Sequence, residues 1–377
     1  MKSKVFGADM RTSFKQNMLQ KLDQLVDSLE MAKTLKPRDL TAIKLHFGER
    51  GNTAFIRPIY IKRIVDKVTQ CQAAPFITDA NTLYVGTRSN SAQHLRTALE
   101  NGFAPSVVGA PLIIADGLRG NSAIGVEINQ KNVKIAYVGA EVVEADALIS
   151  AAHFKLHEVA GFGGAIKNVG MGSASRRGKL DQHSGLGPKV QAKKCIGCGD
   201  CQARCSQKAI TLQEQPNAKT LKAFINPEKC IGCADCILAC PQGAIQVQWS
   251  ASIPTFMEKM VEYTAAALKG KEGKSFFINF LTQISPGCDC LPFADAPIVR
   301  DIGILASTDI VALDQASADL VNQEPALPGA CLKTATGPGE DKIRGVYPNI
   351  DWEKQLEYAE SLGLGSRDYE LEWLPAK

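Results

Sequence analysis

The cysteines of this chain form the pattern with the clearest chemistry. Two runs share the spacing C-x2-C-x2-C-x3-C, and the run that begins at position 230 repeats the run that begins at position 195, 35 residues earlier. Three closely spaced cysteines on a tight loop can bind three corners of a cubane iron–sulfur cluster, and the fourth thiolate must come from elsewhere. Zinc also binds C-x2-C pairs and is the alternative, but four cysteines per run and matching Ile-Gly pairs favour clusters. The cysteines are Cys195, Cys198, Cys201 and Cys205 in the first run, and Cys230, Cys233, Cys236 and Cys240 in the second.

Residues 190–249, which contain both runs, resemble the bacterial two-cluster ferredoxins. In that family the fourth cysteine of each run binds the other cluster, so the resemblance implies two [4Fe–4S] clusters with crossed ligands. One departure is that Ser206 follows Cys205, whereas Pro241 follows Cys240. The implied ligand sets are Cys195, Cys198, Cys201 and Cys240 for one cluster, and Cys230, Cys233, Cys236 and Cys205 for the other.

Cys288 and Cys290 form a separate pair in the stretch S-P-G-C-D-C and are not needed by the two clusters. They could chelate one additional metal ion together with two further ligands. They could also form a redox pair that cycles with a disulfide, although this spacing closes a strained ring. The third interpretation is two thiols packed in a loop. Cys71 and Cys331 lie outside any motif and are expected to be inert.

Polar side chains follow three predicted strands at the points where these strands end. His46 follows a strand that begins at Thr41, Asp79 follows Pro75–Thr78, and His153 follows Ala147–Ala151. Ligands of parallel α/β sheets bind at the carboxyl ends of the strands, so these side chains are expected to meet there. The candidate catalytic residues are His46, Asp79, His153, Lys155 and His157. His153 or His157 would donate protons and Lys44 or Lys155 would bind an anion; the alternative is that each histidine makes structural hydrogen bonds.

A glycine-rich segment at residues 161–168 and a basic segment at residues 167–194 follow these strand ends. Glycines permit close backbone approach to a bound group, and the amino terminus of a following helix favours an anion. Residues 167–194 are locally basic, so this segment could hold an anionic substrate, dock an acidic partner, or form a solvated linker. G-x-G-x-x-G at a strand-to-helix turn and the P-loop motif are both absent from the sequence. The candidate residues for cofactor binding are Lys44, Gly163, Gly164, Lys167 and Arg176.

Strand patterns alternate with helix patterns on both sides of residues 190–249, which predicts an α/β domain with a mostly parallel sheet. The simplest architecture is one such domain, made of residues 1–189 and 250–377 and interrupted by a small α+β ferredoxin-like module. Two independent α/β domains are the alternative, and the tail from residue 324 is expected to lie across the surface. The expected helices are 12–33 (capped by Thr12 or Ser13), 58–71, 91–100, 256–268, 309–321 and 352–362. The expected strands are 41–47, 75–79, 111–115, 126–128, 133–138, 147–151, 275–281 and 298–305.

The composition is that of an ordinary globular protein, with 45% hydrophobic and 22% charged residues. A net charge of +4 on 377 residues gives no argument for binding to nucleic acid. The sequence has neither a signal peptide nor an apolar run of membrane-spanning length, so we expect a cytoplasmic protein without membrane insertion. Twelve cysteines in that compartment favour metal ligation over disulfides.

The order of motifs along nearly the whole chain resembles the family of uncharacterised iron–sulfur-centre proteins. The motifs include H-F-G-E-R-G-N at 46–52, T-D-A-N-T-L-Y-V-G-T-R at 78–88, the glycine-rich segment at 153–172, A-S-R-R-G-K at 174–179, P-G-C-D-C at 286–290 and D-I-G-I-L-A-S at 301–307. The resemblance implies a two-cluster redox protein of mainly anaerobic prokaryotes, with no settled substrate.

Three functions are compatible with these motifs. The preferred one is an oxidoreductase, in which the clusters deliver electrons to a small-molecule substrate at the strand ends, with an anion as the candidate. Its expected electron donor is a redox partner protein or a small molecule, and the sequence does not specify whether a flavin takes part. The alternatives are an electron carrier or adaptor subunit, and a protein that handles metals or cofactors through Cys288 and Cys290.

Overall fold

The computed structural model describes residues 2–184, 187–216, 218, 220–248 and 252–375. Its centre is an eight-stranded sheet in which seven strands run in one direction and only β15 runs against its neighbours. The predicted α/β fold with a mostly parallel sheet is therefore confirmed. The strands in spatial order are β16 (Tyr369–Trp373), β1 (Ser3–Asp9), β15 (Gly303–Ser307), β14 (Ser275–Leu281), β7 (Ala147–His153), β2 (Leu40–Lys44), β3 (Ala74–Asp79) and β4 (Leu112–Ile114).

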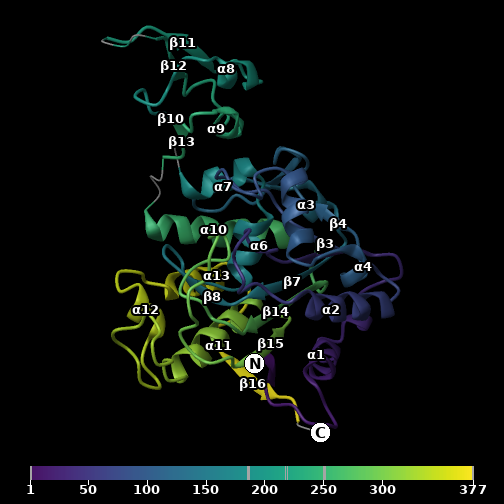
Figure 1. Cartoon of the computed structure of the whole chain (residues 1–377). Helices are drawn as coiled ribbons and strands as arrows, with labels where there is room; N and C mark the ends of the chain where they lie inside the picture. The colour runs from purple at the N-terminus through teal and green to yellow at the C-terminus, as the bar shows by residue number, and fades with distance from the viewer. Residues whose placement is uncertain (1, 185–186, 217, 219, 249–251, 376–377) are drawn as a thin grey trace.

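The sheet separates two hydrophobic cores, because successive side chains of a strand point to opposite faces. Ile43 and Ile149 pack into the core formed with α1 (Met18–Asp27) and α2 (Pro58–Gln70). Leu148 and Phe277 pack into the core on the other face. That second core is formed with α6 (Ala165–Ser173), α10 (Ile253–Leu268), α11 (Ile310–Gln323) and α13 (Glu353–Ser361), and the layers can be followed in Figure 1.

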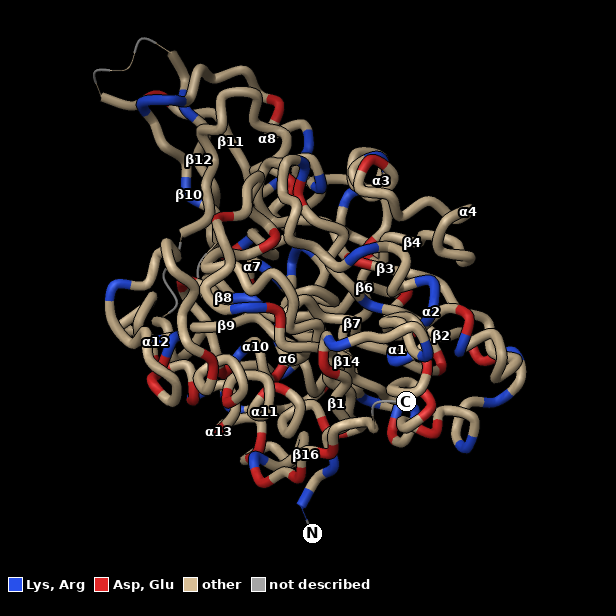
Figure 2. Tube along the Cα trace, turned by 60° about the horizontal axis from the view of Figure 1, so that its bottom comes forward, with Lys and Arg blue, Asp and Glu red and all other residues tan. Residues whose placement is uncertain are grey.

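The remaining elements of the α/β part are short, apart from the ten-residue helix α3 (Ser91–Glu100). Strands β5 and β6 form the predicted hairpin, and α3 has the predicted bounds. Figure 2 shows Lys, Arg, Asp and Glu interspersed along the whole trace, in keeping with a net charge of only +4. These elements are η1 (Met31–Lys33), α3 (Ser91–Glu100), α4 (Pro105–Val108), β5 (Ala123–Glu127), β6 (Ile135–Gly139), α5 (Ala140–Glu144), β8 (Lys155–His157), β9 (Gly161–Gly163), α7 (Arg176–His183) and α12 (Lys342–Val346).

Two predictions at the ends of the chain were wrong, and one predicted strand has a different start. Helix α1 begins at Met18 rather than near residue 12, because Asn17 accepts from the backbone N–H of Gln20 at 3.0 Å and so caps it. The tail does not lie across the surface: β16 pairs with β1, and α13 buries Leu356 in the core. The strand expected at 298–305 begins only at Gly303 and is the antiparallel one.

The cysteine-rich segment forms a small unit beyond the end of the α/β part, shown at the top of Figure 1. Two antiparallel strand pairs and two short helices surround a core of their own, which Leu83 and Leu180 of the α/β part join. The boundaries predicted at 189/190 and 249/250 remain predictions. The elements are β10 (Lys189–Val190), α8 (Asp200–Arg204), β11 (Ile210–Gln213), β12 (Lys222–Ile225), α9 (Asp235–Ala239) and β13 (Ile245–Gln246).

In the part of the chain that the structure describes, no helix has both the length and the apolar character needed to cross a membrane.

Candidate functional site

Two separate cavities lie inside the cysteine-rich unit, and each is lined by four cysteines. Each set combines the first three cysteines of one run with the last cysteine of the other, because α8 and α9 pack side by side. These sets are the crossed ligand sets expected from the ferredoxin resemblance. The first cavity is lined by Cys195, Cys198, Cys201 and Cys240, and the second by Cys205, Cys230, Cys233 and Cys236.

Backbone amides point at three of these sulfur atoms. The N–H of Ala223 donates to Cys195 Sγ at 3.4 Å, and the N–H of Ala244 donates to Cys240 Sγ at 3.2 Å. The N–H of Ala209 donates to Cys205 Sγ at 3.3 Å. Such bonds stabilise thiolate ligands and tune the potentials of iron–sulfur clusters. Within the described part of the chain, no three His, Cys, Asp or Glu side chains converge closely enough to hold a single metal ion.

A second group of polar side chains lies at the carboxyl ends of the parallel strands, centred on Asp79. Its carboxylate contacts Lys44 Nζ at 2.9 Å, Arg88 Nη1 at 3.2 Å and His94 Nε2 at 3.5 Å. All four side chains are buried. Burial raises the pKa of Asp79, but Lys44 and His94 lower it by more, so the net pKa is well below its ordinary value.

Asp289 is the centre of a neighbouring buried network. Its carboxylate contacts His153 Nδ1 at 2.8 Å and Lys155 Nζ at 3.3 Å. Burial raises the pKa of Asp289, but His153 and Lys155 lower it further, so it is a carboxylate in the folded chain. His153 Nε2 lies 2.8 Å from the carbonyl oxygen of Thr282. Both ring nitrogens therefore lie within hydrogen-bond distance of protein oxygens, which fixes the orientation of the imidazole.

Contacts between loops join the two networks into one site. The backbone N–H of Glu49 donates to the carbonyl oxygen of Asp289 at 3.0 Å, and the Glu49 carboxylate contacts Arg88 Nε at 3.3 Å. Arg88 also donates to the hydroxyl of Tyr84 at 2.9 Å, which in turn donates to the carbonyl oxygen of Cys290 at 3.0 Å. We call this group the strand-end site, consisting of Lys44, Glu49, Asp79, Tyr84, Arg88, His94, His153, Lys155, Lys167, Cys288, Asp289 and Cys290.

Cys288 and Cys290 lie in the turn that follows β14, on the same rim as Asp79 and His153, as expected from the sequence. Lys167 Nζ is 3.7 Å from Cys288 Sγ. A hydrogen bond from the Cys290 thiol lowers the pKa of Cys288 well below its ordinary value, and Lys167 lowers it further although burial opposes both. The same hydrogen bond, together with burial, raises the pKa of Cys290.

Two of the candidate histidines have structural partners. His46 Nδ1 accepts from the N–H of Gly48 at 2.9 Å, and His157 Nδ1 accepts from the N–H groups of Val159 and Ala160, both at 3.1 Å. Burial lowers the pKa of both imidazoles well below the ordinary value, so they are neutral acceptors for loop amides. This is the structural alternative considered from the sequence. His153 differs from them in that both of its ring nitrogens are bound, by Asp289 and by the carbonyl oxygen of Thr282, and one of these partners is a carboxylate.

The glycine-rich segment does not offer a free helix terminus to an anion, contrary to expectation. Gly164 caps α6, but the first amides of that helix are already bound by Asp314 from α11: Oδ1 accepts from Ala165 at 2.7 Å and Oδ2 from Ile166 at 2.9 Å. A Cβ on Gly164 would lie 2.3 Å from Asp314 Oδ1, so the glycine serves this internal carboxylate. Gly163 packs against Lys167 and Lys155.

We expect Asp314→Ala to lower the free energy of unfolding by about 3 kcal/mol, because it leaves buried N–H donors without an acceptor. Asn279 would also lose the acceptor of its side-chain amide, which lies 2.7 Å from Asp314 Oδ1. Urea unfolding measures the loss. Asp314→Asn keeps one acceptor and should cost about half as much; equal costs for the two variants would contradict this role.

Arg176 is buried at the junction with the cysteine-rich unit and not in the strand-end site. Its Nη1 is 3.3 Å from Asp235 Oδ1, and Asn121 Nδ2 donates to Asp235 Oδ2 at 2.8 Å. Arg176 therefore fastens α9 to the α/β part. The basic segment is also not a solvated linker as far as residue 183, since it forms α6 and α7 and buries Lys179.

Several members of the strand-end site were not predicted from the sequence. Arg88 and His94 come nine residues or more after the end of β3. A search for polar residues directly after a strand therefore does not find them. Glu49 and Arg88 did fall in the quoted family motifs, which was the available signal. Tyr84 lies in the same motif as Arg88.

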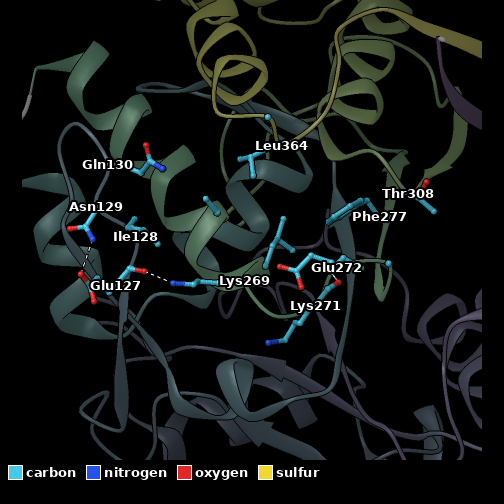
Figure 3. A pocket seen from close by; sticks show the side chains of 15 residues that line it. Glu127, Ile128, Asn129, Gln130, Lys269, Lys271, Glu272, Phe277, Thr308 and Leu364 are labelled. Carbon is cyan, nitrogen blue, oxygen red and sulfur yellow. Dashed lines mark hydrogen bonds between the residues drawn. The ribbon is translucent and has the colours of Figure 1, made fainter.

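A cavity of about 610 Å³ lies at the opposite edge of the sheet (Figure 3). It is lined by Ser275, the first residue of β14, whereas Cys288 lies beyond the other end of that strand. Lys269 and Glu127 face it, and Lys269 Nζ donates to the carbonyl oxygen of Glu127 at 2.6 Å. None of the candidate site residues lines this cavity.

Fold and site together define an α/β protein in which a cysteine-rich unit is set between the strands that form the sheet. The family model described as Domain of unknown function (DUF362) matches residues 41–319, and the chain belongs to this family. This agrees with the expected uncharacterised family.

Among curated proteins, no match was found. Two solved structures are similar at low identity: the lactate racemase apoprotein from Thermoanaerobacterium thermosaccharolyticum (13% identity, TM-score 0.39) and a protein from Thermotoga maritima (10% identity, TM-score 0.41). The matches cover 86% and 94% of this chain but only 58% and 60% of those chains. The chain thus spans about three fifths of the length of these structures.

Proposed function

We propose that the chain is an iron–sulfur redox protein whose two [4Fe–4S] clusters relay electrons to the strand-end site. The observation that carries the proposal is the pair of cavities, each lined by four cysteines in the crossed pattern. The donors fit this group because thiolates are the ligands of such clusters and backbone amides lie on three of the sulfur atoms. When bound, the clusters would supply single electrons.

The loop after β3 supports a relay between the two regions. Leu83 packs in the core of the cysteine-rich unit together with Cys236. The next residue, Tyr84, donates to the carbonyl oxygen of Cys290 in the strand-end site. A continuous packed segment therefore connects the second cavity with the site that would use the electrons.

The many ionisable side chains at the strand-end site make an oxidoreductase that acts on a small anionic substrate our preferred function. Lys44 and Arg88 lie beside the carboxylate of Asp79, and Lys155 and His153 lie beside that of Asp289. In this proposal the cations would bind the anion and His153 would supply the proton. An electron carrier or adaptor subunit would not need so many buried charges, each of which is costly to desolvate. The donor would be a redox partner protein or a small-molecule reductant.

Anaerobic purification followed by iron and sulfide counts tests the proposal. We expect about eight iron atoms and about eight sulfides per chain, and a paramagnetic signal on reduction by dithionite. Bound zinc without sulfide would contradict the proposal, and about four iron atoms would contradict the paired sites. About twelve iron atoms would indicate a third cluster.

A further inference from the structure

We propose that Cys288 and Cys290 form a reversible disulfide that serves as the two-electron centre of the strand-end site. This inference rests on the proposed function for the source of its electrons. The sulfur pair itself is defined by the fold.

The backbone brings the two cysteines to a spacing that a disulfide can span. The N–H of Leu291 donates to the carbonyl oxygen of Cys288 at 3.0 Å, which closes a turn with Asp289 and Cys290 at its two central positions. In an extended chain the Cα atoms of alternate residues lie up to about 7 Å apart, the outer limit for a disulfide. The turn shortens this separation, so the two Cα atoms fall within the range that a disulfide spans.

The turn is held in place from both sides. Asp289, between the two cysteines, is fully buried and is bound by His153 and Lys155. The hydroxyl of Tyr347 donates to the carbonyl oxygen of Pro286 at 2.7 Å, and Tyr84 donates to that of Cys290. A fixed turn keeps the sulfur atoms together in both redox states, so the pair can open and close without refolding the loop.

The two sulfur atoms have different surroundings. Cys288 is buried, with only 2% of its surface exposed, and lies beside Lys167, whereas Cys290 is partly exposed. A buried thiolate beside a lysine is a poor nucleophile toward a large external disulfide because the partner cannot reach it. It is, however, well placed to reform the bond with its own neighbour. The arrangement therefore favours internal cycling over exchange with another protein.

The redox step balances with the electrons that the proposed clusters supply. The Sγ–Sγ bond would break as the disulfide takes up two electrons and one proton, and two one-electron clusters held by the crossed cysteine sets would supply these electrons. Cys288 becomes the thiolate facing Lys167, and Cys290 becomes the thiol, with its proton taken from water at its exposed side. In the reverse direction, the bond would reform as two electrons pass to a small anionic oxidant, the substrate class of the proposed function, and the Cys290 proton is released.

The test begins with the thiols, because trypsin releases Ser275–Arg300, a peptide that contains Cys288, Cys290 and no other cysteine. The anaerobically purified protein is equilibrated with buffers of oxidised and reduced dithiothreitol, alkylated and analysed by mass spectrometry. We expect the peptide to lose about 2 Da and to resist alkylation under oxidising conditions, and to take up two alkyl groups under reducing ones. Two alkylated thiols in every buffer would overturn the proposal.

Electron counting then tests the link to the clusters. Reductive titration of oxidised protein that holds about eight iron atoms should consume about four electrons per chain, two for the clusters and two for the disulfide. Cys288→Ser/Cys290→Ser should consume about two with its iron unchanged, and the matched control Cys71→Ser/Cys331→Ser should consume about four. Two electrons in the unmodified protein would refute the two-electron centre. A low iron content with normal thiol cycling would instead refute the proposed function alone.

A milder variant tests the role of Lys167 without removing sulfur. Lys167→Met takes a positive charge from the Cys288 thiolate, which is present only in the reduced pair. The dithiol-to-disulfide ratio of the buffer at the midpoint should therefore rise about tenfold. An unchanged midpoint would mean that the thiolate is not at Cys288, contrary to the proposal.

Discussion

Asp79→Ala is expected to lower the free energy of unfolding by about 4 kcal/mol, because it removes one partner from a buried ionic network. Lys44 and Arg88 would be left as buried cations without this carboxylate, and the backbone N–H of Ala80 would lose an acceptor at 2.9 Å. Lys44 Nζ would still donate to Asn168 Oδ1, which lies 3.0 Å away. We therefore expect the end of β2 to shift without local unfolding. Urea unfolding monitored by circular dichroism measures the change.

The matched control is Asp27→Ala, which removes an exposed carboxylate from a lysine pair. Asp27 lies 2.6 Å from Lys67 Nζ, but its side chain is 61% exposed. Exposed pairs contribute less than about 1 kcal/mol, so this variant should be close to the unmodified protein. Similar losses for the two variants would show that Asp79 is not the centre of a buried network.

The contribution of Asp79 to the free energy of unfolding should decrease at low pH. Its pKa is depressed in the folded chain, so its carboxylate contributes stability above the unfolded pKa of about 4, and this contribution is lost as pH falls through the folded pKa. The difference in unfolding free energy between the unmodified protein and Asp79→Ala should be constant from about pH 6 to 8 and shrink below about pH 4. A difference that grows with falling pH would contradict the depressed pKa of Asp79 in the folded chain.

Cys240→Ala is expected to halve the iron content, from about eight to about four atoms per chain, and to release the cluster of the other run. The reason is the crossed lining of the cavities, in which Cys240 joins Cys195, Cys198 and Cys201. Alkylation of the native protein reports which cysteines become free, because trypsin separates Cys195–Arg204 from Cys230–Lys259. The three cysteines of the first peptide should become alkylated, and Cys230, Cys233 and Cys236 should stay protected.

Cys205→Ala is the reciprocal control. In this variant Cys230, Cys233 and Cys236 should become alkylated, and the cysteines of the first peptide should stay protected. If each run held its own cluster, Cys240→Ala would instead expose the remaining cysteines of the second peptide. The two variants therefore distinguish crossed from uncrossed ligation even though both lose the same amount of iron.

Local patterns predicted most elements of this fold, and long-range pairing accounts for what they missed. Pro58 at the first turn of α2 and Asp309 before α11 marked helix starts that the structure confirms. Strand β1 was missed because its partners come from the far end of the chain: Phe6 pairs with Ala306, and β16 lies on its other side. A seven-residue segment with Lys and Gly carries too weak a signal without those partners.

The strand-end site was predictable where a residue directly follows a strand and was not predictable elsewhere. Asp79 and His153 were found by this rule, and the position of Cys288 after β14 placed it on the same rim. Arg88 reaches Asp79 only because the intervening loop folds back over the strand ends, which depends on tertiary contacts such as that of Tyr84 with Cys290. The role of Asp314 at the start of α6 was also invisible, since it lies 149 positions from Ala165.

Because the sheet takes strands from both sides of the cysteine-rich unit, the order of synthesis has a consequence for assembly. A chain emerging from the ribosome completes both cysteine runs before β14 exists, and His153 must wait for Asp289, 136 positions later. Domains generally fold as units during synthesis, so the cysteine-rich unit can mature first. The strand-end site can close only later, after residues 275–290 have been made, so the cysteine-rich unit can be complete before the site that it would serve.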